Sequence, residues 1–286
     1  MSIFSRIVER LFFLAAAGSA LLTVAVFLLL LYLALPLFEQ GGFWALIRSP
    51  WDPGAGFYGI YPMLVGSLSI AFLALLIGFP LSLGGAFFIT CFAPLFLRRH
   101  LLNLVRLLTG VPTVVYSFAA LFLLVPFLRE NLTGGSGLNI LGAALMLAVL
   151  IAPTMIIFFV DALRRVPSGF LQAVTALGGS PAQGLVYIAL PLAWPGILNG
   201  LLLGLGRAMG DTMISLMIAG NAVALPESMT DSARTLTAHI ALVIAADVSS
   251  LEFQSIFACG ILLYLFTALL VLMVRLLGKF PKRSPG

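Results

Sequence analysis

Six long apolar runs constrain the fold of this chain more than any other feature of its sequence. The runs cover residues 11–38, 60–90, 106–128, 138–160, 196–222 and 253–277. A helix needs about 20 apolar residues to cross the hydrocarbon core of a bilayer. Only helices and closed barrels satisfy their backbone groups in lipid, and runs without apolar-polar alternation are helical. The sequence therefore predicts an all-α polytopic membrane protein with about six transmembrane helices.

The composition indicates that lipid is the solvent of this chain. Hydrophobic residues make up 62% of the 286 residues, charged residues make up 9%, and the mean hydropathy is +1.17. A soluble domain has about a quarter of its residues charged. Arg6 and Arg10 precede the first run, as in a signal peptide, but the apolar core of a signal has only about 7–15 residues. We therefore expect an uncleaved first helix.

Most basic residues fall on one side of the six predicted spans. With the N-terminus inside, eleven of the 15 Lys and Arg residues are cytoplasmic, three are outside, and Arg207 lies within a span. The cytoplasmic residues are Arg6, Arg10, Arg98, Arg99, Arg106, Arg164, Arg165, Arg275, Lys279, Lys282 and Arg283, and the outer ones are Arg48, Arg129 and Arg234. The positive-inside rule therefore predicts that both termini are cytoplasmic. The net charge of +5 reports this topology, because a nucleic-acid partner would require basic residues clustered on one face.

The runs and loops predict one membrane domain with additions at both ends. Residues 1–59 form an N-terminal transmembrane helix and an outer, periplasmic loop, and residues 60–277 form the membrane domain with a cytoplasmic loop at 161–195. Residues 278–286 form a cytoplasmic tail. The apolar segment Leu236–Ala246 is too short to span, so we expect a short outer-face or re-entrant element there.

The sequence has no signature of a metal site, a nucleotide site or a catalytic centre. Cys91 and Cys259 are far apart and favour packing roles, and neither His100 nor His239 has the spacing of a metal ligand. A phosphate-binding loop would need the pattern GxxxxGK[ST], which is absent, so ATP hydrolysis would belong to another chain. We expect no cofactor on this chain. A membrane enzyme would need His, Asp or Glu clustered at one membrane face, and the sequence has no such cluster.

The inner loop 161–195 has the signals of two short helices joined by a turn. Gly178 stops the first helix, Ser180 caps the second, and Pro181 takes its first helical position. Around this turn the chain reads Gln172-Ala173-Val174, then Gly178, then Ile188-Ala189-Leu190-Pro191.

This register resembles the loop of ATP-binding-cassette importer permeases, written EAA, three residues, G, nine residues, I, one residue, LP. The spacing agrees at every marked position, while Gln172 replaces Glu and Val174 replaces the second Ala. The resemblance implies a type I ABC importer permease (MetI-like) fold with a loop that docks on a partner ATPase. The residues that it assigns to coupling are Gln172, Ala173, Gly178, Ile188, Leu190 and Pro191.

Four further blocks are similar to the phosphate-specific permeases of the PstC type, in order along nearly the whole chain. The blocks are Trp51-Asp52-Pro53, Gly110 to Tyr116, Gly204 to Asn221, and Arg234-Thr235-Leu236. That family usually has Glu at the position of Asp211. The resemblance implies a subunit of an ATP-driven phosphate importer in a bacterial inner membrane. It also implies a PstA-type permease, a PstB-type ATPase dimer and a periplasmic phosphate-binding protein as partners.

Arg207 and Asp211 are the only charges well inside a predicted span. Four residues apart, they share one helical face, and Gly200 and Gly204 on that face clear space beside the arginine. Charges inside a span face a cavity or the bundle interior, and a guanidinium donates two parallel hydrogen bonds to an oxyanion. The pair is therefore either a structural ion pair or part of a substrate path. The resemblance favours the path, with Thr212 as a further polar lining residue.

Small residues on the same predicted helix indicate close packing. Gly206 and Gly210 form a second face of small residues at a spacing of four, and Gly200 and Gly204 form the first.

Two alternative functions remain open. The same kind of machine could carry phosphonate, phosphite or sulfate, and an ion-coupled secondary transporter would need further buried carboxylates and internal repeats.

Overall fold

The computed structural model is almost entirely helical and describes residues 3–133 and 135–278, with side chains described except at 3–6, 38–45, 133 and 278. The long helices are α1 (Ile3–Arg48), α2 (Tyr61–Phe87), α3 (Leu95–Thr109), α6 (Ile140–Arg164), α9 (Leu190–Gly210) and α12 (Leu251–Gly278). The short ones are α4 (Thr113–Ala119), α5 (Val125–Leu128), α7 (Ser168–Ala176), α8 (Pro181–Gln183), α10 (Met213–Ile218) and α11 (Leu236–Val243). Four π-helical segments continue these helices: η2 (Phe88–Phe92), η3 (Ala120–Leu124), η4 (Arg129–Thr133) and η5 (Gly184–Ala189).

Six helical runs among the described residues are long and apolar enough to cross a membrane. They are Ile7–Leu37, Tyr61–Phe92, Thr113–Leu132, Ile140–Arg164, Pro181–Gly210 and Leu251–Leu277. This confirms the predicted all-α fold with six spans. The first, second, fourth and sixth spans agree with the predicted runs to within a few residues, whereas the third and fifth differ.

The predicted third span, 106–128, is wrong at its start. The structure ends α3 at Thr109, leaves Gly110 to Pro112 outside any helix, and begins the span at Thr113. Proline lacks the amide proton of a helix interior and disfavours helical backbone in the residue before it, which explains the break. The preceding helix α3 is amphipathic, with Leu102 and Val105 buried and its arginines at the surface or half-buried.

The predicted fifth span, 196–222, is shifted. A continuous helical run starts at Pro181, passes through η5 into α9, and stops at Gly210. Ser180 starts this run with a reciprocal capping box, in which its hydroxyl accepts from the Gln183 amide at 3.3 Å and the Gln183 side chain accepts from the Ser180 amide at 2.8 Å. The second part of the predicted loop 161–195 is therefore already helix.

The predicted outer loop at 39–59 is partly helical instead. Helix α1 continues to Arg48, and a hairpin of β1 (Trp51–Asp52) and β2 (Phe57–Tyr58) follows, joined by the 3-10 turn η1 (Pro53–Ala55). The strands are antiparallel, with Trp51 opposite Tyr58. The predicted tail at 278–286 lies outside the described residues from 279 onward.

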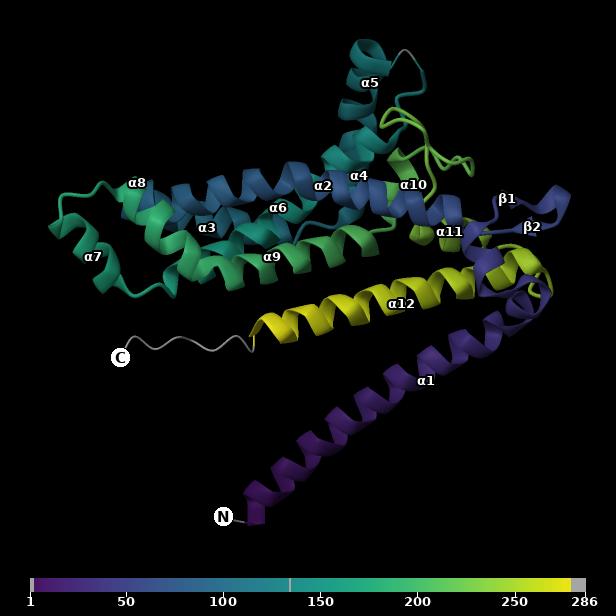
Figure 1. Cartoon of the computed structure of the whole chain (residues 1–286), viewed down its shortest axis with the longest axis horizontal. Coiled ribbons are helices and arrows are strands. Elements are labelled where there is room, and N and C mark those ends of the chain that lie inside the picture. Colours follow the sequence, from purple (N-terminus) through teal and green to yellow (C-terminus); the bar gives the residue numbers. More distant parts are fainter. Residues whose placement is uncertain (1–2, 134, 279–286) are drawn as a thin grey trace.

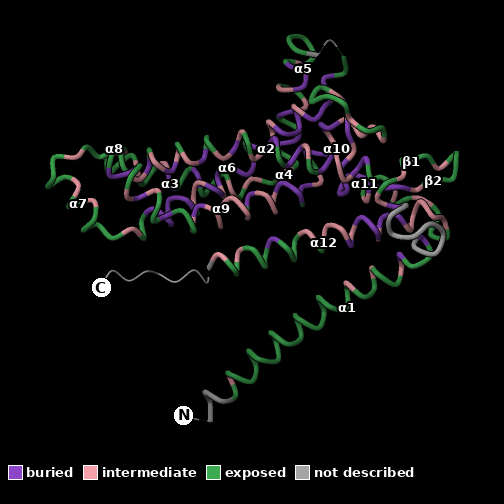
Figure 2. The backbone as a smooth tube through the Cα atoms, in the orientation of Figure 1, coloured by how far each residue is buried: buried purple, intermediate pink, exposed green. Residues whose placement is uncertain are grey.

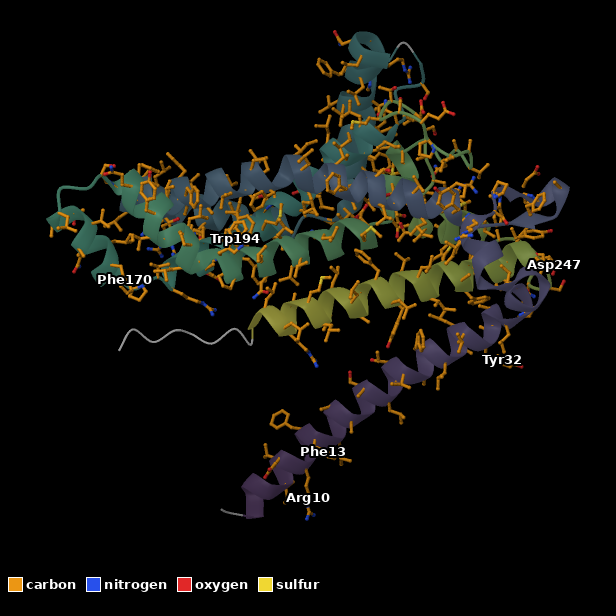
Figure 3. The ribbon with its side chains drawn as sticks, in the orientation of Figure 1. Arg10, Phe13, Tyr32, Phe170, Trp194 and Asp247 are labelled. Atoms are coloured by element: carbon orange, nitrogen blue, oxygen red, sulfur yellow. The ribbon has the colours of Figure 1, made fainter. Side chains whose placement is uncertain are left out.

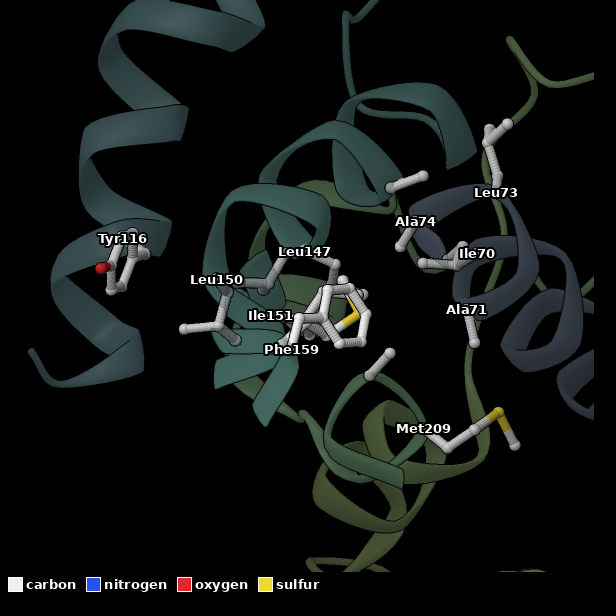
Figure 4. Packing of buried hydrophobic residues seen from close by; sticks show 14 of the residues in the cluster. Ile70, Ala71, Leu73, Ala74, Tyr116, Leu147, Leu150, Ile151, Phe159 and Met209 are labelled. Carbon is white, nitrogen blue, oxygen red and sulfur yellow. The ribbon is translucent and has the colours of Figure 1, made fainter. Parts of the chain in front are cut away.

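Helices α2, α6 and α9 pack together as the centre of the bundle. Figure 4 shows the buried side chains of α2 and α6, including Ile70, Ile151 and Phe159. The Phe159 side chain is fully buried and meets Phe79 of α2 edge-on, with ring centroids 5.9 Å apart. The bundle centre is therefore built from apolar side chains of helices that are far apart in sequence.

The long helices run between two opposite ends of the molecule (Figure 1). We call these the α7 end, marked by residues 168–183, and the hairpin end, marked by residues 51–58. Helix α1 begins and α12 ends on the α7 side, and α1 diverges from α12 toward its N-terminus. Most of α1 is exposed (Figure 2), and its side chains Phe13 and Tyr32 are 71% and 69% exposed (Figure 3). Surface this apolar requires lipid or a protein partner.

Candidate functional site

The fifth span is interrupted at Asp211 and Thr212. Helix α9 ends at Gly210, Asp211 has extended backbone with φ −74° and ψ 127°, and α10 begins at Met213. The Asp211 carboxylate caps the new helix by accepting from the Ile214 amide at 2.8 Å, and the Thr212 carbonyl accepts from the Leu216 amide at 2.8 Å. The interruption is therefore stabilised by its own sequence, because the Asp211 carboxylate supplies the cap that the start of α10 requires.

Hydroxyl groups from two elements close around the Asp211 backbone. The Asp211 carbonyl oxygen accepts from the Thr237 hydroxyl of α11 at 3.0 Å and from the Ser215 hydroxyl at 3.4 Å. Asp211 is only 8% exposed. Sequence reasoning did not identify Thr237 as a partner, because it follows 26 residues later in a segment with no distinctive motif.

Arg207 points toward α6 and is not paired with Asp211. Its Nη1 atom donates to the Thr154 hydroxyl at 2.6 Å, and within the described chain no ion pair joins Arg207 to an acid, although its charge acts on Asp211 at longer range. The predicted pairing assumed that both residues share one helix, and it does not form because Asp211 has left the helix. Thr154 was missed, although its position beside Pro153 in the fourth span was visible in the sequence.

The glycines of α9 have different surroundings. A Cβ atom at Gly200 would lie 2.8 Å from the Phe158 and Phe159 side chains, and one at Gly204 would lie 2.9 Å from Met155. These two glycines therefore allow close approach of α6, rather than opening space beside Arg207. Gly206 faces Leu270 of α12, at 3.3 Å from its Cβ position. The Cβ position of Gly210 has no described atom within 4 Å apart from its chain neighbours and its own helix backbone.

After α10 the chain makes a loop, and residues near Ala233 then run parallel to the residues that directly follow α10. Gly220 and Asn221 have positive φ of 87° and 61°, and a bridge joins Gly220 to Ala233. The Ala233 amide donates to the Ala219 carbonyl at 2.8 Å, and Arg234 follows with its Nε atom donating to the Asn221 carbonyl at 3.1 Å. The chain then enters α11, an eight-residue helix whose Leu236 to His239 are buried. This agrees with the expectation of a short element that does not span.

The loop between α6 and α9 forms a protruding helix and a glycine turn at the α7 end. No side chain of α7 is buried, and Phe170 of this helix is visible at the edge of the molecule in Figure 3. Gly178 has φ +79°, its amide donates to the Thr175 carbonyl, and the Gly179 amide donates to the Val174 carbonyl. These bonds form a Schellman motif, in which a left-handed glycine ends the helix.

The remaining loop residues divide between this turn and the following helix. Gln172 and Ala173 are both exposed on α7, whereas Ile188 lies in η5 and Leu190 and Pro191 begin α9. Leu171 of α7 packs toward Gly184, where a Cβ would lie 3.4 Å from its Cδ2 atom. The two halves of the loop motif therefore meet at the base of α7.

The described residues contain no group of three or more His, Cys, Asp or Glu side chains that could hold a metal ion. Cys91 and Cys259 are both free thiols. His239 is fully buried, donates to or accepts from the Ser255 hydroxyl at 2.9 Å, and packs edge-on against Trp51 with ring centroids 4.4 Å apart. Burial, with a smaller effect from the nearby Arg234 charge, lowers the pKa of His239 to about 4.

Comparison with known proteins agrees with this architecture. The family of binding-protein-dependent transport system inner membrane components matches residues 78–283. The fold is similar to a chain of a bacterial ABC transporter involved in the import of the acidic polysaccharide alginate, with 17% identity, a TM-score of 0.63, and coverage of 98% of this chain and 100% of that one. It is also similar to the MetNI methionine ABC transporter in an inward-facing conformation, with 21% identity, a TM-score of 0.56, and coverage of 82% and 96%.

Curated relatives are similar along most of their length. The probable ABC transporter permease protein YqgH of Bacillus subtilis (strain 168) is 34% identical over 78% of this chain and 72% of the relative. The phosphate transport system permease protein PstC of Pasteurella multocida (strain Pm70) is 31% identical over 93% of this chain and 89% of the relative. The chain belongs to the family of binding-protein-dependent transport system inner membrane components. Within this family of multi-pass membrane proteins, it belongs with the ABC permeases of the PstC type.

Proposed function

We propose that this chain is the transmembrane permease subunit of an ATP-driven importer of inorganic phosphate in a bacterial inner membrane. The observation that carries this proposal is the 31% identity with a phosphate transport permease over 93% of the chain. Further relatives named as phosphate transport permeases, at 30% and 28% identity over 82% and 84% of the chain, support the same substrate. All three relatives are named as permeases, so ATP hydrolysis is assigned to a partner chain.

The proposed complex contains a second permease of the PstA type, a dimer of PstB-type ATPases and a periplasmic phosphate-binding protein. Helix α7 is the docking element for the ATPase, with Gln172 and Ala173 on its surface and the Gly178 turn at its tip. Leu177 at this tip is 89% exposed, which supports a protein partner because α7 lies beyond the six apolar spans. In this arrangement the α7 end is cytoplasmic, the hairpin end is periplasmic, and both termini are cytoplasmic.

The same proposal divides the chain into three parts. Residues 1–59 form an N-terminal helix and periplasmic hairpin, 60–277 form the transport domain with the coupling loop 161–195, and 278–286 form a cytoplasmic tail. Exposed aromatic side chains on the arm from α4 to α5, Phe118, Phe122 and Phe127, support contact with lipid and with the second permease. This arm rises from the bundle in Figure 1.

The interruption after α9 supports a substrate path beside Arg207. A broken helix at membrane depth is tolerated only where protein or a polar cavity surrounds the free backbone groups. Arg207 offers a planar cation that suits a tetrahedral oxyanion, and the Thr154 hydroxyl fixes one of its nitrogens. Asp211 and Thr212 shape the break, and Asp211 partly offsets the charge of the arginine at longer range. A single cation held in this way binds an anion weakly enough to release it.

Competition for uptake tests the substrate. The complete complex is expressed in cells lacking their own phosphate uptake systems, and uptake of radiolabelled phosphate is measured with roughly a hundredfold excess of unlabelled phosphate, phosphite, a phosphonate or sulfate. We expect ATP-dependent uptake that only unlabelled phosphate abolishes. Uptake that sulfate, phosphite or the phosphonate suppresses as strongly would assign the permease to another oxyanion.

A further inference from the structure

Two arginines lie at opposite ends of α10. Arg207 belongs to the last turn of α9, before the break at Asp211, while Arg234 bonds to the backbone of Asn221, just after α10. Helix α10 has six residues, which correspond to about 9 Å at 1.5 Å per residue. The fold therefore places a second guanidinium on the hairpin side of the break, beside the residues that directly follow α10.

The backbone around Arg234 is fixed between α2 and the start of α11. A Cβ atom at Gly66 of α2 would lie 2.5 Å from the Arg234 carbonyl oxygen, so only glycine permits this approach. The next residues are also held, because the Thr235 hydroxyl caps α11 and the Leu236 amide donates to the Ser67 hydroxyl at 2.8 Å. With Nε bonded to Asn221, the position of the guanidinium is set by the fold.

Within the described chain, the Arg234 guanidinium has no counter-ion. Among residues 3–133 and 135–278 no ion pair joins it to an acidic group, and its one side-chain hydrogen bond runs from Nε to the Asn221 carbonyl, which leaves both Nη atoms without a partner there. The residue is half-buried, and burial lowers the pKa of the guanidinium from its ordinary value. A partly desolvated cation without an acid attracts anions more strongly than a solvated or paired one.

Arg129 provides a contrast, because it is a second arginine assigned to the same side of the membrane. Its Nε and Nη2 atoms both donate to the Ser136 carbonyl, at 3.1 and 3.0 Å, and the residue is exposed. Arg129 therefore has the same charge as Arg234 and lies on the same side of the membrane in the proposed topology. Two of its donors, however, already bond to the backbone of its own loop. This makes Arg129 a matched control for an effect of charge alone.

We propose that Arg234 makes the first contact between this chain and the transported oxyanion, on the hairpin side of the Arg207 site. The inference rests on the proposed phosphate function and adds a receiving residue to it. The anion released at the periplasmic face meets the unpaired Nη atoms of Arg234, and then passes along α10 to Arg207. With one fixed arginine at each end of α10, the anion meets two weak binding sites one after the other. Weak binding at Arg234 lets the anion enter and then move on to Arg207.

Charge-changing variants test this proposal in the complete complex. Arg234→Gln is expected to reduce phosphate uptake at least roughly tenfold, because glutamine lacks the charge that strengthens a hydrogen bond to an anion. Arg234→Lys is expected to retain intermediate uptake, because the ammonium keeps the charge but loses the planar fork. Arg129→Gln is expected to transport like the unmodified chain. Wild-type uptake in Arg234→Gln would overturn the inference, and so would an equal loss in Arg129→Gln.

Chemical restoration of the charge separates anion contact from a structural role. In a chain carrying Cys91→Ser and Cys259→Ala, Arg234→Cys is treated from the periplasmic side with aminoethyl methanethiosulfonate or with the neutral methyl reagent. We expect only the aminoethyl reagent to restore uptake, with unchanged yield of the complex. Equal effects of the two reagents, no restoration by either, or failure of every Arg234 variant to assemble would each overturn the proposal.

The same experiments distinguish this inference from the proposed function. If the unsubstituted chain in its complex does not accumulate phosphate, the proposed function fails. If the unsubstituted chain accumulates phosphate and the Arg234 variants do so equally, the proposed function stands and only the receiving role of Arg234 fails.

Discussion

Arg207 of α9 donates a hydrogen bond of 2.6 Å to the hydroxyl of Thr154 on α6, 53 residues earlier in the chain. This contact joins the broken fifth span to the centre of the bundle. It leaves the remaining donors of the guanidinium available, because this bond is the one side-chain interaction of Arg207 among the described residues and no acid is paired with it there. The Thr154 hydroxyl is neutral, so it orients Arg207 without cancelling the positive charge. An arginine needs this uncancelled charge in order to bind an anion.

Thr154 is therefore expected to position Arg207. Thr154→Val keeps the shape of the side chain but leaves the guanidinium nitrogen without its acceptor. We expect phosphate uptake to fall roughly tenfold or more, because hydrogen bonds to charged groups contribute about 1.5–3 kcal/mol. Thr154→Ser keeps the hydroxyl and is expected to transport nearly normally. Radiolabelled phosphate uptake at equal complex yield checks both variants, and equal uptake in Val and Ser would show that the bond does not matter for transport.

Asp211 is expected to act as a helix cap rather than as the ion partner of Arg207. Asp211→Asn keeps an oxygen that can accept from the Ile214 amide, so the stability of the complex should change little. Asp211→Ala removes the cap and should destabilise the folded chain by about 1 kcal/mol. Thermal unfolding midpoints of the purified complex in detergent compare the two variants. If Asn lowers the midpoint as much as Ala does, the charge of the carboxylate matters and the cap alone is an insufficient account.

Gly178 is expected to be required for coupling because of its backbone conformation. Its φ is +79°, and apart from its chain neighbours no described atom lies within 4 Å of the position that a Cβ atom would occupy, so a substitution strains the backbone without causing a clash. Left-handed backbone costs about 1–2 kcal/mol for an ordinary L-residue, and least for Asn. Gly178→Val should leave the complex assembled but abolish ATPase stimulation and uptake, whereas Gly178→Asn should retain both. Normal coupling in the Val variant would contradict the docking role of this turn.

His239 is expected to make stability depend on pH. It belongs to α11, outside the six spans, and its pKa is lowered from 6.5 to about 4 in the folded chain. As the pH falls below 6.5, the unfolded chain takes up a proton that folded His239 does not, so stability falls until about pH 4. His239→Gln should show a smaller drop in thermal midpoint between about pH 7.5 and pH 5 than the unsubstituted chain. Equal drops would show that His239 is not the group responsible.

Local sequence signals were sufficient to predict where the helices stop and start in the loop 161–195. Ser180, Pro181 and Gly178 act through their immediate neighbours, so their capping and turn geometry could be predicted from residue type and spacing. The six spans could be predicted because lipid requires long apolar helices whatever their packing.

The interruptions and the partners of the polar residues could not be predicted in this way. Averaged hydropathy does not register a break such as that at Gly110 to Pro112 or at Asp211, because apolar residues continue on both sides. The bonds from Arg207 to Thr154 and from Thr237 to Asp211 join residues far apart in sequence. Their pairing depends on how α6, α9 and α11 pack, which residue spacing along one helix does not reveal.

The most direct test of a phosphate path at Arg207 is phosphate accumulation by proteoliposomes containing the complete complex with Arg207→Gln, alone and together with Asp211→Asn. If Arg207 meets the anion, ATP-dependent accumulation should be abolished in both variants while complex yield stays at the level of the unsubstituted chain. If Arg207 serves only to neutralise Asp211, the single variant should assemble poorly and the double variant should recover. Accumulation near the unsubstituted level in the double variant would contradict a role for Arg207 in the phosphate path.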